Sequence, residues 1–253
     1  MILDQFRLDG KTALVTGSSA GLGAAMAIAL AEAGADVVCH GNARSPYETC
    51  KAIEKLGRHS AGIQADLAKS GAAETLFEKA QRVAPVDIVI NNAGTIRRAK
   101  AIEYSDADWT EVLQVNLNSL WKLCQAAGRC FIARRATGKI VNIASLLAFQ
   151  GGITVPAYAA SKGAVAQLTK ALANEWASQG VNVNAIAPGY MRTDNTDSLQ
   201  RDEARNRQIL ERIPAQRWGE PSDICGAALF LASRASDYVH GHVLVVDGGW
   251  MGR

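Results

Sequence analysis

Residues 16–23 read TGSSAGLG, and this stretch decides how the rest of the chain is interpreted. It follows a short apolar run and precedes an alanine-rich segment, so we expect it to form the turn between a strand and a helix. Glycines at Gly17, Gly21 and Gly23 allow a tight turn and a close approach of the backbone to a pyrophosphate, while the helix N-terminus supplies N–H donors. The spacing is G-x-x-x-G-x-G and not the commoner G-x-G-x-x-G, but its place in the first strand-helix unit predicts a nucleotide site.

Outward from this turn, short runs rich in Val and Ile alternate with longer segments of helical period along the whole chain. This alternation is typical of strand-helix-strand units around a parallel sheet that is buried on both faces. We therefore predict an α/β fold over residues 1–253: a single-domain Rossmann-type doubly wound sheet of about seven parallel strands with helices on both faces. The predicted strands are 13–16, 36–40, 60–65, 86–91, 138–144, 182–187 and 242–246. The predicted helices are 21–33, 46–56, 72–83, 106–135 (as two helices), 157–179 and 222–232.

One long polar segment, at about residues 189–219, interrupts this alternation directly after a predicted strand. We expect one short amphipathic helix in it, around residues 198–212. Ligands of open parallel sheets bind beyond the carboxyl ends of the strands, so the segment is predicted to be a substrate lid. A solvated surface excursion is the alternative, although long insertions inside compact domains are usually functional.

Composition limits the class of partner. The chain has 253 residues, of which 48% are hydrophobic and 20% charged, so it is long enough to bury a sizeable core. Its formal net charge of +3 is evenly scattered, which argues against a nucleic-acid or membrane partner and favours a small molecule. The uncharged stretches at 12–31 and 140–161 contain glycines and polar residues, so no membrane helix is expected. The amino-terminal MILDQFRLDGK lacks the apolar core of a signal peptide, and a cytoplasmic protein is predicted.

The cysteines and histidines point to no metal site. The five cysteines are an odd number without a C-x-x-C pair, so neither a disulfide framework nor a thiolate site is indicated, and we expect buried free thiols. The four histidines show no ligand spacing with carboxylates or thiols, so they are interpreted as structural and no metal is predicted. These residues are Cys39, Cys50, Cys124, Cys130 and Cys225, and His40, His59, His240 and His242.

A second candidate site lies in the stretch YAASK, in which Tyr158 and Lys162 are four residues apart and share one face of the predicted helix. An ammonium close to a phenol lowers the pKa of the phenol, which a general acid-base tyrosine requires. Ser145 follows the predicted strand at 138–144, where its hydroxyl is able to bond a substrate oxygen. Taken alone, the tyrosine and lysine also fit a surface packing pair.

The order and spacing of six features identify a family. Essentially the whole chain resembles the short-chain dehydrogenase/reductases, which implies a nicotinamide cofactor. The features are TGSSAGLG at 16–23, Asn91-Asn92-Ala93-Gly94, Asn116 in a helix, Ser145, YAASK at 158–162, and Pro188-Gly189.

The resemblance implies four catalytic residues. Tyr158 is the acid-base residue, Ser145 polarises the carbonyl, Lys162 lowers the pKa of the tyrosine and holds the nicotinamide ribose, and Asn116 supports a proton-relay water. It also implies a cofactor-binding set, in which Asp66 and Leu67 face the adenine and the run from Pro188 to Thr193 contacts the carboxamide. That set comprises Gly17, Ser19, Gly21, Leu22, Gly23, Asn42, Asp66, Leu67, Asn92, Ala93, Gly94, Tyr158, Lys162, Pro188, Gly189, Met191 and Thr193.

The choice between NAD(H) and NADP(H) stays open. NAD-preferring members of this family carry an acidic residue at the end of the second strand, and Gly41 occupies that position here. Asn42 follows it, Ala20 stands where many NADP-users carry a cation, and Arg44 is able to meet a 2′-phosphate. We expect a slight preference for NAD(H), with use of NADP(H) possible.

Further segments resemble the subgroup that acts on keto and hydroxyl groups of deoxy-keto sugar acids of the 2-keto-3-deoxygluconate type. Such substrates are anions, and Arg97, Arg98 and Arg192 follow strand ends on the predicted cofactor side, where a guanidinium clamps a carboxylate. Gln150 is able to bond a hydroxyl. A solvated rim or a subunit contact is the alternative for the paired arginines. The segments include TIRR at 95–98, AFQGGI at 148–153, APGYMRTDNT at 187–196 and the carboxyl-terminal VDGGWMGR.

Three alternatives accompany this interpretation. A 3-oxoacyl thioester reductase, or another gluconate-type dehydrogenase, shares the fold and the catalytic set. A non-catalytic nucleotide-binding regulator is disfavoured because all four catalytic residues are present. The resemblance further implies a homotetramer, with a dimer as the main alternative and Trp250 at an interface or against the lid.

Overall fold

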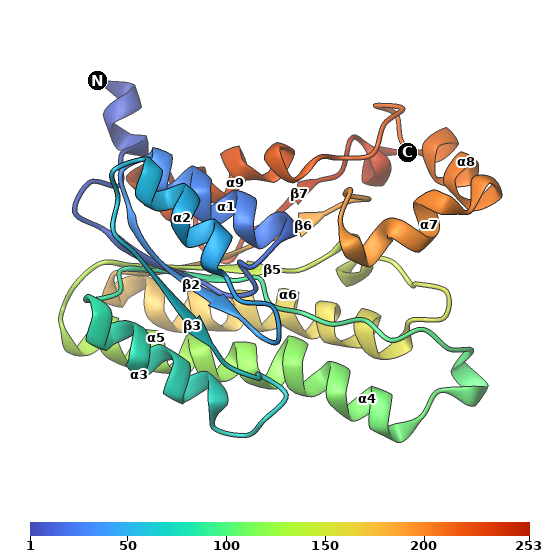
Figure 1. Ribbon diagram of the computed structural model, residues 1–253, viewed down its shortest axis with the longest axis horizontal. Coiled ribbons are helices and arrows are strands. Elements are labelled where there is room, and N and C mark those ends of the chain that lie inside the picture. The colour runs from blue at the N-terminus through green and yellow to red at the C-terminus, as the bar shows by residue number, and fades with distance from the viewer.

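The computed structural model describes residues 1–253 and contains one seven-stranded sheet in the order β3-β2-β1-β4-β5-β6-β7 (Figure 1). Every neighbouring pair of strands is parallel. The order reverses between β1 and β4, which is the switch point of a doubly wound sheet, so the predicted fold class is confirmed. The strands are β1 Thr12–Val15, β2 Asp36–Gly41, β3 Ser60–Gln64, β4 Ile88–Asn91, β5 Gly138–Ile143, β6 Val181–Pro188 and β7 Val243–Val246.

Helices cover both faces of the sheet: α1, α2 and α9 lie on one face, and α3, α4, α5 and α6 on the other (Figure 1). Side chains of the strands alternate between two cores. In β1, Val15 joins the core that contains Met26, whereas Leu14 joins the core that contains Phe131. The helices are α1 Gly21–Glu32, α2 Tyr47–Lys55, α3 Ala72–Val83, α4 Asp106–Leu113, α5 Ser119–Ala133, α6 Pro156–Trp176, α7 Asp197–Arg201, α8 Glu203–Arg212 and α9 Cys225–Ala232.

The two helices predicted in 106–135 are confirmed, whereas the single helix predicted around 198–212 is not. The two helices expected in 106–135 are joined without a break by a π-helical turn, Gln114–Asn118. The single helix expected around 198–212 is wrong, because α7 ends and α8 begins at Asp202, whose backbone is extended. The Asp202 carboxylate accepts a hydrogen bond from the Arg205 N–H at 3.0 Å and so caps α8 as a separate helix.

The segment that carries α7 and α8 has its own apolar anchor. Ile209 and Ile213 pack with Trp218 and Trp250 in a third buried cluster, and the guanidinium of Arg212 lies 4.1 Å from the Trp250 ring centroid. Trp250 is therefore buried against this segment. The same cluster contains Leu146, which follows β5, and Tyr190, which follows β6, so α8 is anchored to the segments after both strands.

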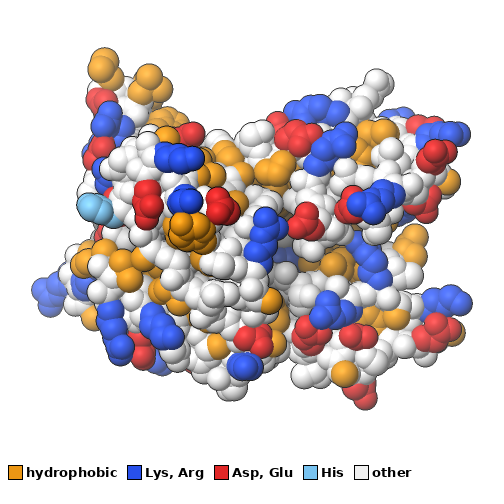
Figure 2. All heavy atoms as spheres, in the orientation of Figure 1, with side chains coloured by type: hydrophobic (Ala, Val, Ile, Leu, Met, Phe, Trp, Pro, Cys, Tyr) orange, Lys and Arg blue, Asp and Glu red, His pale blue; other side chains and the backbone are white.

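The cysteine thiols form no disulfide, and the surface charges are mixed in sign. All five cysteines are free, and Cys130 and Cys225 are half-buried where burial was expected. No three His, Cys, Asp or Glu side chains lie close enough together to hold a metal ion. No helix combines the length and the apolar character that a membrane span requires. Figure 2 shows acidic and basic side chains interspersed over the face of the molecule that it presents.

Candidate active site

A cavity of about 500 Å³ lies where the strand order reverses, at the carboxyl ends of the central strands. Its wall is formed by the β1–α1 turn, the segments after β3 and β4, the end of β5, α6 and the first residues after β6. Most of the predicted site residues line it. They are Gly17, Ser19, Gly21, Leu22, Gly23, Asn42, Asp66, Leu67, Asn92, Ala93, Gly94, Arg97, Ser145, Tyr158, Lys162, Pro188, Gly189, Met191 and Thr193.

The glycine-rich turn fits a dinucleotide. Gly17 and Gly21 have φ values of +65° and +54°, which side-chain-bearing residues rarely adopt. A Cβ atom at Gly23 would overlap the carbonyl oxygen of Gly17, so the turn closes tightly against the start of α1. Asn92 holds this turn, since its Nδ2 donates to the carbonyl oxygens of Thr16 at 2.9 Å and Gly17 at 3.2 Å. The turn and the N-terminus of α1 therefore form a cradle of the kind that binds a pyrophosphate.

Tyr158 and Lys162 face the cavity from the start of α6, opposite Ser145. The Lys162 side chain is 3% exposed, and its Nζ donates to the carbonyl oxygen of Ile143 at 2.6 Å. Burial lowers the pKa of Lys162 to about 8. The Lys162 Nζ lies 5.5 Å from the centroid of the Tyr158 ring.

The pKa of Tyr158 differs from the expectation based on sequence. Burial raises the pKa of this phenol, and the Ser145 hydroxyl and the charge of Arg98 offset that rise in part. The lowering expected from Lys162 is not found, because the ammonium is desolvated and directed at the Ile143 carbonyl.

Asn116 lies behind the cavity wall, in the π-helical turn, and is fully buried. Its Oδ1 accepts from the Thr95 N–H at 2.7 Å, and its Nδ2 donates to the Thr95 carbonyl at 2.9 Å and to Ser161 Oγ at 3.3 Å. π-Turns recur at functional sites, and here the turn directs the amide at the segment that follows β4. The side chain therefore connects that segment to the start of α6.

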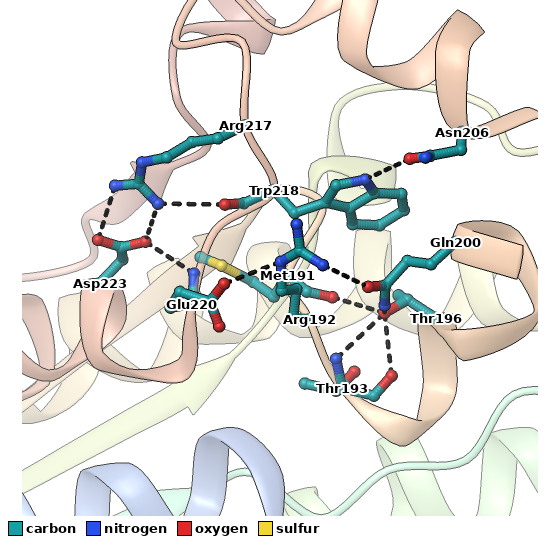
Figure 3. A network of polar contacts seen from close by, with 10 residues as sticks. All are labelled: Met191, Arg192, Thr193, Thr196, Gln200, Asn206, Arg217, Trp218, Glu220 and Asp223. Atoms are coloured by element: carbon teal, nitrogen blue, oxygen red, sulfur yellow. Dashed lines mark hydrogen bonds and ion pairs between the residues drawn. The ribbon is translucent and has the colours of Figure 1, made fainter. Parts of the chain in front are cut away.

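The four candidate substrate residues separate into three groups. Arg97 lines the cavity, but its NH2 lies 2.7 Å from Glu111 Oε1. Arg192 and Gln150 do not line it: Arg192 pairs with Glu220 at 2.8 Å (Figure 3), and Gln150 accepts from Trp250 Nε1 at 2.9 Å. Arg98 does not line the cavity either: it is exposed, has no ion pair or side-chain hydrogen bond, and its charge partly offsets the raised pKa of Tyr158. Of the three candidate arginines, Arg98 is therefore the one without an acidic partner.

The two ends of the segment 189–219 are tied together (Figure 3). Met191 pairs with Gly219 in an isolated bridge, and Thr196 Oγ1 donates to the Met191 carbonyl at 2.6 Å. Trp218 Nε1 donates to Asn206 Oδ1 at 2.7 Å and so joins the end of the segment to α8. The segment is therefore a closed loop beside the cavity.

The absence of an acid at Gly41 has a steric cause. A Cβ atom there would overlap the Arg44 carbonyl oxygen, because the segment after β2 folds back over Gly41. That fold is held by Gln64, whose Nε2 donates to the Asn42 carbonyl at 3.0 Å. The Arg44 guanidinium lies 3.7 Å from the Asp194 carboxylate, in the segment after β6.

Sequence reasoning missed several residues of the wall, of which His40 is the most informative. It was interpreted as structural, but it lines the cavity and accepts a hydrogen bond from the Gly17 N–H. Its place one residue before Gly41, at the end of a predicted strand, was the available signal. Thr95, Glu111 and Asp194 also line the cavity.

Comparison with known proteins identifies the class. Residues 17–251 match the family model described as Enoyl-(Acyl carrier protein) reductase. The chain is 55% identical to a 2-dehydro-3-deoxy-D-gluconate 5-dehydrogenase of Bacillus subtilis, with 99% of this chain and 98% of the relative covered. With the glycine-rich turn and the Ser-Tyr-Lys cavity, this similarity defines an NAD(P)-dependent oxidoreductase that acts on CH–OH groups. The chain belongs to the short-chain dehydrogenase/reductase family.

Solved structures agree with this assignment. A protein of Agrobacterium tumefaciens assigned as a 2-deoxy-D-gluconate 3-dehydrogenase, with bound NADP, has a TM-score of 0.94 and 55% identity, over 98% of this chain and 99% of that one. A gluconate 5-dehydrogenase of Burkholderia cenocepacia, in complex with NADP and tartrate, has a TM-score of 0.92 and 39% identity, over 100% of both chains.

Proposed function

We propose that this enzyme interconverts a ketone and a secondary alcohol on a deoxy-keto sugar acid of the 2-keto-3-deoxygluconate type. The observation that carries the proposal is the common cavity of the glycine-rich turn, Ser145, Tyr158 and Lys162, with the uncommitted cation of Arg98 near the phenol. A sugar acid presents a carboxylate for such a cation and a carbonyl or hydroxyl for the phenol. The 55% identity to a sugar-acid dehydrogenase supports the same substrate class.

In the proposed mechanism, the chain orients the substrate oxygen and moves one proton. A bound nicotinamide exchanges hydride with the substrate carbon. The Ser145 hydroxyl holds the substrate oxygen, and Tyr158 donates its phenolic proton to that oxygen in reduction and takes it back in oxidation. Lys162, whose ammonium is directed at the Ile143 carbonyl beside the cavity, holds the nicotinamide ribose. Asn116 keeps Thr95 and the start of α6 in position.

The test is an assay of the purified enzyme with 2-keto-3-deoxygluconate and its 5-keto derivative, using NAD(H) and NADP(H) in parallel. Turnover of either sugar acid supports the proposal. Reduction of an acetoacetyl thioester without turnover of any sugar acid would replace it by a 3-oxoacyl reductase, and nucleotide binding without turnover of any carbonyl would indicate a regulator.

Arg98 is proposed to bind the substrate carboxylate. Arg98→Ala is expected to raise KM for the sugar acid about 10- to 100-fold with a smaller change in kcat, because a charged hydrogen bond is worth about 1.5–3 kcal/mol. Steady-state kinetics measure the effect. Arg82→Ala, which removes an exposed arginine on α3, is the matched control and should leave KM unchanged. Equal KM values for the two variants would assign the carboxylate to another group.

We propose that both nicotinamide cofactors bind to this enzyme. Arg44 and Asp194 are proposed to control the affinity for NADP(H) relative to NAD(H), through the charge that Arg44 offers to the 2′-phosphate. The pair is exposed, with side-chain exposures of 66% and 90%, so it contributes little to stability and Arg44 is free to exchange partners. Arg44→Gln is expected to weaken NADPH binding about tenfold and NADH binding by less than about twofold. Asp194→Asn should shift NADPH binding in the opposite direction. Calorimetric titration measures both, and parallel shifts for the two cofactors would contradict this role.

The segment 189–219 is proposed to act as the substrate lid, and a homotetramer is proposed as the assembly. Asp194 and its neighbours line the cavity, which supports the lid. The edge strand β7 is only half-buried and the Tyr238 side chain beside it is fully exposed, which supports a contact with a second copy. A sedimentation mass equal to one chain would contradict the assembly.

A further inference from the structure

His40 is the one ring on the cavity wall whose two nitrogens both contact backbone groups of the nucleotide half of the site. It is 2% exposed and precedes the last residue of β2. Its Nδ1 lies 3.1 Å from the Gly17 nitrogen, and its Nε2 lies 3.0 Å from the Ala65 carbonyl oxygen. An amide N–H only donates and a carbonyl only accepts, so Nδ1 is the acceptor and Nε2 carries the proton. These contacts specify the neutral Nε2–H tautomer.

The two backbone groups belong to separate parts of the site. Gly17 opens the glycine-rich turn, and Ala65 directly precedes Asp66, which lines the same cavity. The main chain of His40 already holds Ser18, since its N–H donates to Ser18 Oγ at 3.0 Å and its carbonyl accepts from the Ser18 N–H at 2.8 Å. The Gly41 carbonyl likewise accepts from the Ala65 N–H at 3.1 Å, so the main chain of β2 already joins the two parts indirectly. The ring adds a direct connection between Gly17 of the turn and Ala65 after β3.

We propose that His40 is a positioning residue for the dinucleotide, and that it acts only in its neutral form. This proposal rests on the use of a nicotinamide cofactor. Protonation of Nδ1 would bring a ring N–H against the Gly17 N–H, and two donors facing each other repel. The turn would then move away from β2, and the spacing between the Gly17 turn and the Asp66 segment would no longer match one nucleotide.

No ionisable side chain hydrogen-bonds to the ring. Asp66 follows β3, the thiols of Cys39 and Cys50 belong to the core that contains Met26 on the other face of the sheet, and the β1–α1 turn contributes no ionisable side chain. Burial lowers the pKa of His40 from its usual 6.5, with the Ala65 carbonyl opposing the shift. In the folded enzyme the ring therefore takes up a proton only below this lowered pKa. The affinity for the cofactor is expected to fall as the pH drops through the lowered pKa, and not between that value and the usual one.

Two substitutions each keep one of the two hydrogen bonds of the ring, and both remove the group that titrates. In His40→Asn the Oδ1 takes the place of Nδ1 and keeps an acceptor for the Gly17 N–H. In His40→Gln the Nε2 takes the place of the ring Nε2 and keeps the donor to Ala65, but the Gly17 N–H loses its acceptor. Comparison of the two variants therefore tests the Gly17 contact independently of the loss of a histidine.

The experiment is calorimetric titration with NAD⁺ between about pH 8 and about pH 5, without substrate. NAD⁺ is used because it is stable in acid, unlike NADH, and lacks a 2′-phosphate that titrates in this range. Below the lowered pKa of the ring, wild-type affinity is expected to fall by up to about tenfold for each pH unit. His40→Asn should bind within about threefold of wild type at the alkaline end and lose the pH dependence. His40→Gln should bind about 3- to 10-fold more weakly throughout, as expected for one lost hydrogen bond.

A second measurement needs no cofactor. Nitrogen NMR of the ¹⁵N-histidine-labelled enzyme is expected to show, at neutral pH, a neutral ring with the proton on Nε2 whose signal is missing in both variants. A ring protonated on Nδ1, the same pH dependence in His40→Asn as in wild type, or wild-type affinity in His40→Gln would overturn the proposal. Failure of the wild type to bind any nicotinamide nucleotide would instead overturn the proposed function, and this role with it. These binding and NMR results do not depend on which sugar acid is the substrate.

Discussion

Replacement of Tyr158 by Phe is expected to lower kcat by about 100- to 10,000-fold while the affinity for the cofactor stays unchanged. Tyr158 lines the cavity together with the glycine-rich turn and Ser145, and its phenol is the group proposed to transfer the proton. General acid-base groups contribute this range of rate acceleration. The raised pKa of Tyr158 keeps the phenol protonated near neutral pH, as the reducing direction requires. The variant keeps the ring and loses only the proton donor.

Single-turnover kinetics with pre-bound NADPH measure this effect without a contribution from product release. Tyr238→Phe is the matched control, since this phenol is 100% exposed and far along the chain from the cavity residues; its kcat is expected to equal that of wild type. Unchanged thermal unfolding of Tyr158→Phe would show that packing is intact. A kcat within tenfold of wild type would assign the proton transfer to another group.

Gly23→Ala is expected to weaken the binding of either cofactor about 10- to 100-fold. The added methyl group would overlap the carbonyl oxygen of Gly17, which is backbone and has no flexible end that moves aside. Overpacking of this kind costs about 1–3 kcal/mol, and the turn relieves it by opening, which displaces its N–H donors. Nucleotide titration measures the loss of affinity, and thermal unfolding measures the accompanying loss of stability.

Gly226→Ala is the control for that substitution. Gly226 is also helical, in α9, but a Cβ atom there meets nothing within 4 Å. This variant should bind both cofactors like wild type and gain about 0.5–1 kcal/mol of stability, as expected for Gly→Ala inside a helix. Equal nucleotide affinities for the two variants would mean that the turn tolerates a side chain at Gly23.

Lys162 shows that spacing along a helix is not sufficient to assign an electrostatic role. Residues four apart on α6 share a face, and Tyr158 and Lys162 do so. The lysine is nevertheless buried, and its ammonium is directed at the Ile143 carbonyl of β5. The helical periodicity predicts that the two side chains are neighbours, whereas the carbonyl at the end of β5 decides the direction of the ammonium.

The parallel sheet and the nucleotide cradle could both be predicted from the amino-acid sequence. Both depend on local patterns: apolar runs alternate with helical segments, and Gly17, Gly21 and Gly23 follow the first strand directly. The helix boundary at Asp202 also has a local signal, since aspartate is a favoured helix N-cap. The amphipathic pattern continues on both sides of Asp202, however, and so predicts one helix instead of two.

Which charged and polar side chains lack a partner could not be predicted, because it depends on contacts between distant parts of the folded chain. Arg97 and Arg192 follow strand ends as Arg98 does, but Glu111 and Glu220 neutralise the first two. Those partners are 14 and 28 positions away along the chain. His40 gained its contact with Gly17 in the same way, from a residue 23 positions away. No local pattern encodes such pairings, because they form only when the folded sheet brings separate strand ends to one edge.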